Sequence, residues 1–586
     1  MIKLFKFLTK KDWLYIFLVF VFTVIGVWLN LLMPDYMTRV TELVETGGSV
    51  SEVWMSGLIM LLCAVGDAVC AIILGYFAAH VAANFSANLR EQIYNKVVSF
   101  SMEEISNFST SSLLTRSTND VTQITMLIAI GLQAILRAPI VAIWAFVKIL
   151  GRAYQLLVIL GIAIIIVICV IIVSMILVIP KFKLIQKLTD ALNRVTRENL
   201  TGVRVVRAYN AEEYQQGKFN VANKNLYDNH LFTGKIMAYL APGLQFVMSM
   251  TSLAIYWVGS HVIQSAAEPM VRIEMFSQLV TFMSYGIQII VSFMMVAMIF
   301  IMLPRAMVAA GRINEVLDKN TKIKDGNNDY FPVGNGKVEF VNVGFSYPDA
   351  EEMVLKNVSF TANPGDTVAF IGSTGSGKST LINLVPRFFD VTEGQILVDG
   401  VDIRDYKISD LHSRIGYISQ KAMLFKGTLR SNIAYGNYEK DEVSDERIIH
   451  SLEVAQGLDI LKQSDVGIDY EVAQGGTNFS GGQKQRISIA RAICKKPEIF
   501  IFDDSFSALD YKTDKALRAA IKEETNGATI LIVAQRIGTV KDADLIVVLD
   551  EGKVAGMGTH EQLLKSCDVY QQIAYSQLSE EELANA

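Results

Sequence analysis

A glycine-rich stretch, GSTGSGKST, carries the clearest chemistry in the sequence, between the apolar runs DTVAFI and LINLVPRFF. It matches the pattern G-x-x-x-x-G-K-[ST], whose backbone N–H groups curl around phosphate oxygens at the start of a helix. In that pattern Lys378 reaches the β- and γ-phosphates and Ser379 binds Mg²⁺. The stretch therefore predicts a nucleoside triphosphate site. The predicted contacts are Gly372, Ser373, Thr374, Gly375, Ser376, Gly377, Lys378, Ser379 and Thr380.

The second candidate for chemistry is PEIFIFDDSFSALD, in which an apolar run ends in the adjacent aspartates Asp503 and Asp504. A carboxylate at the end of a buried strand beside the phosphates can hold Mg²⁺, here through water. Asp503 directly follows the apolar residues 499–502 and is therefore the expected metal ligand, together with Ser379. Asp504 needs a separate explanation, because one carboxylate suffices for the metal.

These groups require a sheet to position them. From Lys337 on, short β-type runs alternate with helical stretches, as in KVEFVNVGF, DTVAFIG, EIFIFDD, ATILIVAQ and ADLIVVLD. Such alternation predicts an α/β domain with a largely parallel sheet, which we assign to residues 337–575. Residues 321–336 are rich in Gly, Asn and Asp and predict a linker, and residues 576–586 predict a solvated tail.

The N-terminal half has a different composition. The whole chain is 51% hydrophobic and 19% charged, against about 25% charged residues in an ordinary soluble protein. Six apolar runs are long enough to cross a bilayer, which takes roughly 20 residues. We therefore expect a polytopic α-helical transmembrane domain at residues 1–320. Its predicted spans are about 13–34, 54–80, 126–149, 155–180, 236–264 and 275–304.

The distribution of lysine and arginine predicts the orientation. These residues concentrate between spans two and three, between four and five, and after six, so both termini and the α/β domain are expected in the cytoplasm. The segment MIKLFKFLTKKDW predicts a short amphipathic helix on the membrane surface, its lysines facing headgroups. A net charge of −5 without a dense basic tract argues against nucleic acid as a partner. The five cysteines form neither a C-x-x-C nor a Cys/His cluster, so we expect no zinc site and no disulfide framework.

A further motif, NFSGGQKQR at residues 478–486, precedes the Asp503 run. This order of motifs resembles the ATP-binding cassette (ABC) transporters, whose signature is L-S-G-G-Q; Phe479 here replaces the leucine. Six spans followed by one cassette are similar to a half-transporter of the exporter type, a multi-pass protein of a bacterial cell membrane. The resemblance implies ATP and Mg²⁺ as cofactors and a dimer of cassettes arranged head to tail.

The resemblance also implies roles for individual residues. Tyr347 in FSYPDAEEMVL matches the aromatic residue that stacks on adenine, and Gln420 in YISQKAMLF matches the glutamine that joins Mg²⁺ to the membrane domain. SALD at 507–510 matches the loop that crosses the dimer interface. Residues 108–121 and 198–213 resemble the stretches around two intracellular coupling helices. The signature residues that would contact ATP bound by the partner cassette are Ser480, Gly481, Gly482 and Gln483.

The sequence departs from the family pattern at the hydrolytic end of the site. Asp504 stands where the family usually has a glutamate that polarises the attacking water, and Gln535 stands where it has a histidine that contacts the γ-phosphate. A carboxylate retracted by about 1 Å can forfeit much of the roughly 10²- to 10⁴-fold that a general base supplies. AQGG, at Gln474 and Gly475, also replaces a charged pair that helps to couple cassette and membrane domain.

These departures predict a slow, degenerate ATP site in a heterodimer whose partner hydrolyses ATP with the help of this chain's signature. The catalytic candidates are Asp504, Gln535 and Gln420, and the metal candidates are Ser379, Gln420 and Asp503. A slow homodimeric exporter, an importer on the same architecture and an ATP-binding regulatory subunit remain open alternatives. The expected cargo is amphipathic, such as drugs, lipids or peptides.

Two charges interrupt the apolar runs, Asp67 and Arg137. Charges within membrane spans are by default candidates for function, facing the bundle interior or water. Arg137 lies in LRAP, which resembles a sequence common at that place in the family, so a structural role is an equal alternative, and a direct pair with Asp67 is a hypothesis. Spans five and six are also rich in Met and Phe, which suit an adaptable cavity, lipid contact or helix packing. These residues include Met248, Met250, Met283, Phe293, Met294, Met295 and Met298.

Overall fold

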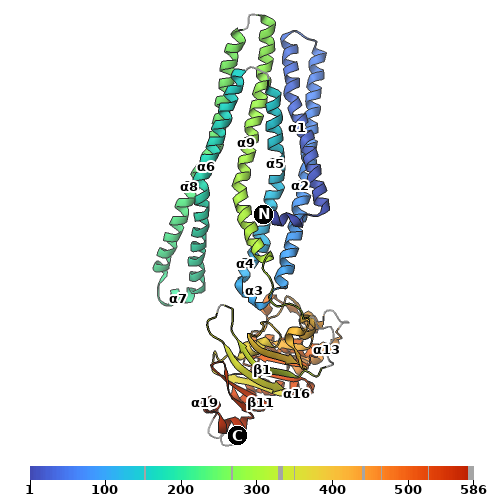
Figure 1. The fold of residues 1–586 in the computed structure, drawn as a ribbon, viewed down its shortest axis with the longest axis vertical. Helices are drawn as coiled ribbons and strands as arrows, with labels where there is room; N and C mark the ends of the chain where they lie inside the picture. The colour runs from blue at the N-terminus through green and yellow to red at the C-terminus, as the bar shows by residue number, and fades with distance from the viewer. Residues whose placement is uncertain are drawn as a thin grey trace. The chain divides into compact units, whose positions relative to one another are not determined.

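The computed structural model describes residues 1–150, 154–265, 268–326, 334–348, 350–437, 443–462, 465–507, 509–525 and 527–578. The chain divides into two compact units, one of Met1–Val98 with Ser109–Lys319 and one of Ser99–Phe108 with Asn320–Ala586 (Figure 1). Part of the predicted linker, residues 327–333, and most of the predicted tail, residues 579–586, lie outside the described residues.

The first unit contains six helices long and apolar enough to cross a membrane, as the sequence predicts. A membrane-crossing segment must satisfy its backbone polar groups internally, which explains long uninterrupted helices. Pairs α1–α2, α6–α8 and α5–α9 pack most extensively, and Figure 1 shows α6 and α8 side by side. The long helices are α1 (Lys10–Glu45), α2 (Val50–Val98), α5 (Val121–Ile149), α6 (Tyr154–Thr201), α8 (Glu212–Ser265) and α9 (Pro269–Leu317).

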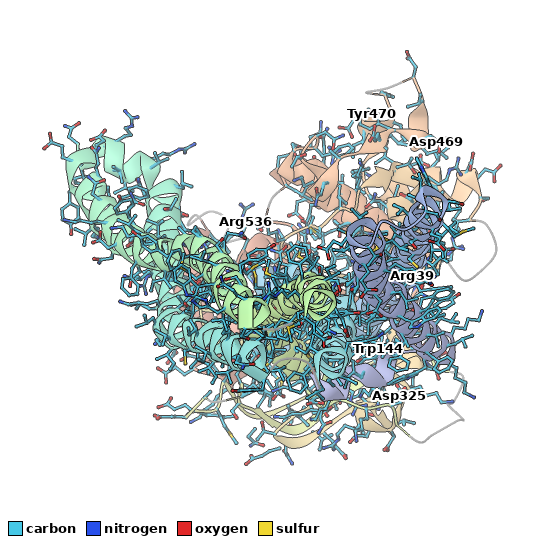
Figure 2. The ribbon with its side chains drawn as sticks, turned by 90° about the horizontal axis from the view of Figure 1, so that it is seen from above. Arg39, Trp144, Asp325, Asp469, Tyr470 and Arg536 are labelled. Atoms are coloured by element: carbon cyan, nitrogen blue, oxygen red, sulfur yellow. The ribbon has the colours of Figure 1, made fainter. Side chains whose placement is uncertain are left out.

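Side chains cover these helices on all sides (Figure 2). The chain begins with a short 3₁₀ helix, η1 (Ile2–Phe7), and a Thr9–Asp12 capping box then starts α1. The predicted amphipathic helix is therefore limited to the 3₁₀ helix η1, because Lys10 already belongs to α1. The Lys3 ammonium lies 2.8 Å from Asp318, so this lysine has a protein partner. Four short elements lie between the long helices: α3 (Met102–Asn107), α4 (Thr110–Thr115), the π-helical η2 (Arg116–Asp120) and α7 (Val203–Ala208).

The second unit is built on a six-stranded sheet with the order β12-β11-β3-β10-β9-β6. All neighbouring pairs are parallel except β11–β12, which confirms the largely parallel sheet. Its strands are β3 (Thr367–Gly372), β6 (Ile415–Ile418), β9 (Ile499–Asp503), β10 (Thr529–Val533), β11 (Leu545–Asp550) and β12 (Lys553–Gly558).

A second, antiparallel sheet contains the first predicted run, KVEFVNVGF, so that this run does not join the parallel sheet. The order is β2-β1-β4-β5, with β1 (Val338–Phe345), β2 (Leu355–Ala362), β4 (Glu393–Val398) and β5 (Val401–Asp402). A two-stranded ladder pairs β7 (Gly427–Thr428) with β8 (Glu471–Val472).

Both faces of the parallel sheet are buried, which explains its near-continuous apolar strands. Along β9, Phe500 and Phe502 pack in one core cluster with α15, while Ile499 and Ile501 pack in the other with α10 and β1. Besides α3, the α-helices described in this unit are α10 (Lys378–Leu384), α11 (Ile408–Ser413), α12 (Leu429–Ile433), α13 (Asp445–Val454), α14 (Leu458–Leu461), α15 (Gly481–Lys495), α16 (Tyr511–Glu524), α17 (Ile537–Val540), α18 (His560–Ser566) and α19 (Asp568–Gln577).

Candidate nucleotide-binding site

The carboxyl ends of β3, β9 and β10 bring the predicted site residues to one edge of the sheet. In the parallel register Val533 of β10 lies opposite Phe370 of β3 on one side and Asp503 of β9 on the other. Ligand sites of parallel sheets form outside this edge. The glycine-rich loop, the two aspartates and Gln535, which follow these strands directly, therefore meet although they are far apart in sequence.

The glycine-rich loop curls around the ammonium group of Lys378, the first residue of α10. Nζ of Lys378 donates hydrogen bonds to the carbonyl oxygens of Gly372 at 2.8 Å and Ser373 at 2.7 Å. Gly377 has φ +97°, a left-handed conformation that favours glycine, and a Cβ there would lie 2.8 Å from Leu355. Burial lowers the pKa of the Lys378 ammonium, and the charge of Asp504 opposes that shift. The arrangement suits a phosphate, which would replace the loop carbonyls as the partner of Lys378.

Ser379 and Asp503 are in direct contact, as expected for two ligands of one metal ion. Ser379 Oγ donates to Asp503 Oδ1 at 2.7 Å. Burial raises the pKa of the Asp503 carboxyl, the Ser379 hydrogen bond opposes this rise, and the charge of Asp504 adds to it. A hydroxyl and a carboxylate are oxygen ligands of the kind Mg²⁺ prefers, and a divalent cation would offset the crowding of negative charge. The residues present fit the ion.

Asp504 collects the other two catalytic candidates around one carboxylate oxygen. Gln535 Nε2 donates to Asp504 Oδ2 at 2.8 Å, and Gln420 Nε2 donates to the same oxygen at 3.2 Å. The backbone of Asp504 has φ +47°, which aspartate tolerates better than most residues, and its N–H donates to the carbonyl of Val533 at 3.0 Å. Burial raises the pKa of Asp504, while the Gln420 hydrogen bond and the charge of Lys378 lower it.

A cavity of about 250 Å³ opens beside this carboxylate. A cavity of this size has room for ordered water next to Asp504, and the polar side chains on its wall are partners for such water. The cavity is lined by Asp504, Phe506, Ser507, Val533, Ala534, Gln535, Arg536 and Thr539. Ser507 begins the predicted interface loop 507–510, of which Ala508 lies outside the described residues.

Tyr347 reaches the same region from the antiparallel sheet. Its hydroxyl lies 3.0 Å from Thr380 Oγ1, in the first turn of α10, and its ring packs edge-on against Phe345 and Phe389. The contact places Tyr347 beside the glycine-rich loop of residues 372–380, called the phosphate loop below. Its role as the adenine platform stays a prediction.

The signature residues are occupied in capping their own helix. Ser480 Oγ accepts a hydrogen bond from the Gln483 backbone N–H at 3.3 Å, and Gln483 Oε1 accepts one from the Ser480 N–H at 2.9 Å. Phe479, which stands where the family has leucine, is buried and packs edge-on against Tyr470. Across the described residues, the structure records no hydrogen bond between Ser480–Gln483 and the phosphate loop of the same chain.

One contact of the site has no counterpart in the sequence motifs. Gln577, at the end of α19, donates from Nε2 to the Gln535 carbonyl at 2.8 Å and accepts the Ile537 N–H at Oε1 at 2.9 Å. It therefore holds the backbone on both sides of Arg536. A single glutamine near the C-terminus carries no sequence signal for such a role.

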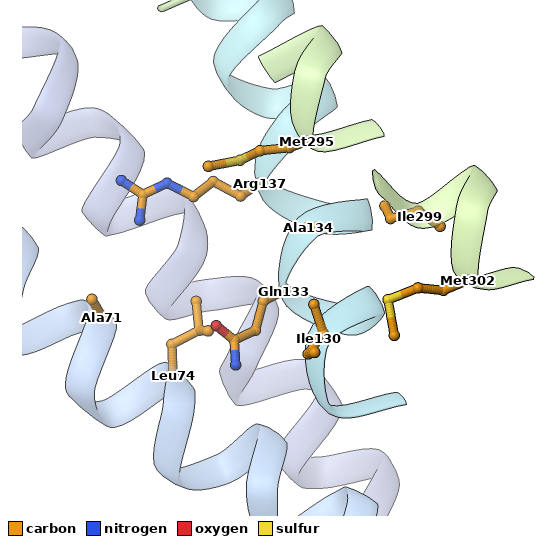
Figure 3. A pocket seen from close by; sticks show the side chains of 9 residues that line it. All are labelled: Ala71, Leu74, Ile130, Gln133, Ala134, Arg137, Met295, Ile299 and Met302. Atoms are coloured by element: carbon orange, nitrogen blue, oxygen red, sulfur yellow. The ribbon is translucent and has the colours of Figure 1, made fainter. Parts of the chain in front are cut away.

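In the helical unit the two intramembrane charges form the hypothesised pair. Arg137 lies 3.3 Å from Asp67 Oδ2, and Asn30 donates to the same oxygen at 3.0 Å. Arg137 also lines a cavity of about 310 Å³ whose other walls are mostly apolar (Figure 3). The lining residues are Ala71, Leu74, Ile130, Gln133, Ala134, Arg137, Met295, Ile299 and Met302.

The methionines and phenylalanines of the fifth and sixth spans divide between several environments. Met295 lines the cavity, whereas Met250 is exposed on the helical unit. The side chain of Met298 lies outside the described residues. The remaining members pack against the buried core of the unit: Met248, Met283, Phe293 and Met294.

Known proteins resemble both parts of the chain. Residues 355–507 match the family described as ABC transporter, and residues 16–293 match the ABC transporter transmembrane region. An uncharacterized ABC transporter ATP-binding protein of Mycobacterium tuberculosis is 38% identical over 541 residues, which cover 92% of this chain and 92% of that protein. A protein of Pseudomonas fluorescens named ATP-dependent lipid A-core flippase is 29% identical over 516 residues, 88% of this chain and 84% of its own.

A solved structure extends the likeness to three dimensions. The structure of a bacterial Atm1-family ABC exporter with ATP bound matches with a TM-score of 0.79 and covers 96% of this chain and 98% of its own, at 22% identity. Likeness at this identity concerns the fold alone. It confirms the predicted class, a polytopic helical domain followed by an α/β nucleotide-binding domain.

Proposed function

Because this chain belongs to the ABC transporter family, we propose that it is one subunit of an ATP-driven exporter of amphipathic compounds, paired with a different, homologous half-transporter. Its own phosphate loop binds ATP, with Mg²⁺ held by Ser379, Asp503 and Gln420, and hydrolyses it slowly. Its signature, Ser480 to Gln483, serves the competent site of the partner. Both termini and the cassette lie in the cytoplasm, as the distribution of lysine and arginine indicates.

The observation that carries the slow-site proposal is the environment of Asp504. Two amide groups, from Gln420 and Gln535, donate to a single oxygen of this short carboxylate. A general base must reach the proton that it abstracts, and an oxygen already accepting two hydrogen bonds is a weaker acceptor for a third. Gln535 can donate to a γ-phosphate but carries no positive charge to stabilise the transition state. The phosphate-binding half of the site has no such departure.

The cavity around Arg137 supports an amphipathic cargo. Apolar walls suit a hydrocarbon portion, and the side chains of Arg137 and Gln133 can meet a polar or anionic group. Asp67 and Asn30 hold the arginine in place, so that the intramembrane charge is not left unpaired. The relative named as a lipid A-core flippase agrees with a lipid-like cargo.

A homodimeric exporter with two slow sites is the main alternative. It is favoured by the fact that Asp504 still supplies a carboxylate at the position of the general base. An importer on the same architecture and an ATP-binding regulatory subunit are the others. The complete signature argues against a purely regulatory subunit, because the signature contacts ATP only in a dimer of cassettes that uses ATP.

Transport into proteoliposomes tests the proposed function. The chain, alone and co-purified with a candidate partner half-transporter, is reconstituted and supplied with external MgATP and a fluorescent anionic phospholipid. We expect uptake only with the partner. Uptake should be lost in Ser480→Arg, because the arginine side chain would block the ATP that is bound by the partner's phosphate loop. Lys484→Arg, one turn further along α15, is the matched control and should transport normally. Full uptake by the chain alone would contradict the heterodimer, and undiminished uptake by Ser480→Arg would contradict the role of the signature.

A further inference from the structure

The predicted linker is firmly bound in its first described part, residues 322–326. At the start of this segment, the Lys322 N–H donates to Glu104 Oε1 at 3.2 Å, and the Lys322 ammonium pairs with Glu103. Both glutamates belong to α3, a short helix that lies in sequence between α2 and α5 but clusters with the cassette unit. The linker and α3 are therefore joined by a charge-assisted contact.

Glu104 is built to make this contact. Its side chain is almost fully buried, and its second oxygen, Oε2, accepts the N–H and hydroxyl of Ser101, which caps α3. Burial alone would raise the pKa of the Glu104 carboxyl, but the hydrogen bonds from Ser101 and Lys322 outweigh burial and lower the pKa. One carboxylate thus holds the start of α3 and the start of the linker together.

The other end of the segment is bonded to the cassette. The Lys324 carbonyl accepts a hydrogen bond from the buried Arg387 guanidinium at 3.0 Å. Asp325, labelled in Figure 2, accepts the N–H of Ile408, the first residue of α11, at 2.9 Å. The Gly326 N–H donates to the Tyr406 carbonyl at 2.9 Å.

Gly326 fixes how closely the segment approaches the cassette. A Cβ at this position would lie 2.0 Å from the Asp405 carbonyl oxygen, which is backbone and cannot move aside as a side chain could. Ile323 is buried on the same segment. A passive tether would need neither this close approach nor the carboxylate contacts.

The two cassette elements that bind the segment lead to the nucleotide site. Arg387 follows α10, whose first two residues are Lys378 and Ser379, and its N–H bonds the Leu384 carbonyl at the end of that helix. α11 runs into β6, which ends two residues before Gln420. The segment thus contacts the continuations of both the phosphate-binding and the metal-contacting residues.

We propose that residues 322–326 form a strap that ties α3 to the segment after the phosphate-loop helix α10 and to α11, which precedes β6 and Gln420, so that MgATP binding is transmitted to α3 within one subunit. The proposal deepens the proposed function, since α3 lies in the stretch between the second and third membrane helices. It assigns the transmission to Lys322, Asp325 and Gly326, which no sequence motif marks.

Hydrogen–deuterium exchange on the full chain in lipid nanodiscs tests the strap without requiring transport. We expect MgATP to slow amide exchange both at residues 372–380 and at α3. In Gly326→Ala, and in Lys322→Ala, protection at 372–380 should persist while protection at α3 falls about fivefold or more, the lower range of typical coupling between sites. Asp325→Ala should behave likewise, and Asp325→Asn, which keeps the acceptor for Ile408, should restore α3 protection.

Lys324→Ala is the matched control, because it removes a lysine as Lys322→Ala does but keeps the backbone carbonyl that Arg387 contacts. It should resemble the unaltered chain. The strap is refuted if α3 gains no protection with MgATP in the unaltered chain, or if Gly326→Ala and Lys322→Ala keep it in full. A failure of transport with normal α3 protection would instead count against the proposed function.

Discussion

The two ends of the candidate nucleotide site differ in how closely their residues follow the family pattern. At the phosphate-binding end, Lys378 lies inside the loop, and Ser379 contacts the expected metal ligand Asp503 at 2.7 Å. At the hydrolytic end, Asp504 and Gln535 replace the longer carboxylate and the histidine of the family pattern, and they bond to each other at 2.8 Å. This difference is the basis of the proposal that the site keeps the residues for binding ATP and has lost those for rapid turnover.

The largest effect is expected from a substitution at the phosphate-binding end of the site. Lys378→Ala removes the ammonium that would bond two phosphates, and charged hydrogen bonds are worth about 1.5–3 kcal/mol each, so ATP affinity should fall on the order of 100-fold or more. Equilibrium binding of a fluorescent ATP analogue to the purified chain measures it. Lys356→Ala, on β2, serves as a control for loss of a lysine. An affinity within threefold of the unaltered chain would mean that the loop does not bind phosphate as proposed.

Restoring the family residues at the hydrolytic end should produce the next largest effect. Asp504→Glu with Gln535→His returns a carboxylate of full reach and a cationic donor, and kcat for ATP should rise roughly 10²-fold, within the range of general-base catalysis. KM should change little, because the phosphate loop is untouched. Steady-state phosphate release from the full chain measures both constants. An unchanged kcat would show that these two residues do not limit turnover.

A smaller effect is expected from Gln577, which supports the hydrolytic end from α19. Gln577→Leu removes hydrogen bonds to Gln535 and Ile537 worth about 0.5–1.5 kcal/mol each, so kcat in the restored double variant should drop several-fold with KM unchanged. Gln571→Leu is the matched control on the same helix, since Gln571 bonds the distant Leu564 carbonyl. Equal losses in both variants would point to general destabilisation of α19.

The smallest effect concerns pH. Burial raises the pKa of both Asp503 and Asp504 in the folded chain without nucleotide. A raised folded-state pKa favours the protonated fold, so the stabilisation is full below the ordinary carboxyl pKa and is lost as pH rises through the raised values. Thermal unfolding without nucleotide should therefore occur at lower temperature as pH rises across this window, and Asp504→Asn should reduce that fall by about 1–3 °C. The same slope in both proteins would contradict this origin.

The sequence predicts well those parts of the site that consecutive residues define. The phosphate loop, Asp503 and the signature each lie next to an apolar strand or at a helix start, and the parallel sheet brings the loop and Asp503 to one edge. Gln577 and the strap escape prediction because their roles depend on tertiary approach. KVEFVNVGF was expected in the parallel sheet and lies in the antiparallel one, since strand periodicity does not specify a partner.

The same limit applies in the helical unit. Asp67 and Arg137 stand out as charges in apolar runs, yet their pairing, and the part of Asn30 in it, follow only from the packing of α1, α2 and α5. Likewise, residues 321–336 have the composition of a linker, and only tertiary contacts, such as the Lys322–Glu104 hydrogen bond and the close approach of Gly326 to Asp405, reveal that residues 322–326 are held in place.

The most direct test of the central claim is the identity of the nucleotide that stays bound. The full chain is incubated with MgATP, freed of excess nucleotide, and the ratio of bound ATP to ADP is followed by chromatography, beside Asp504→Glu with Gln535→His. A slow binding site predicts that ATP remains the main bound nucleotide in the unaltered chain, while ADP accumulates in the double variant. Conversion to ADP at the same rate in both proteins would contradict the account.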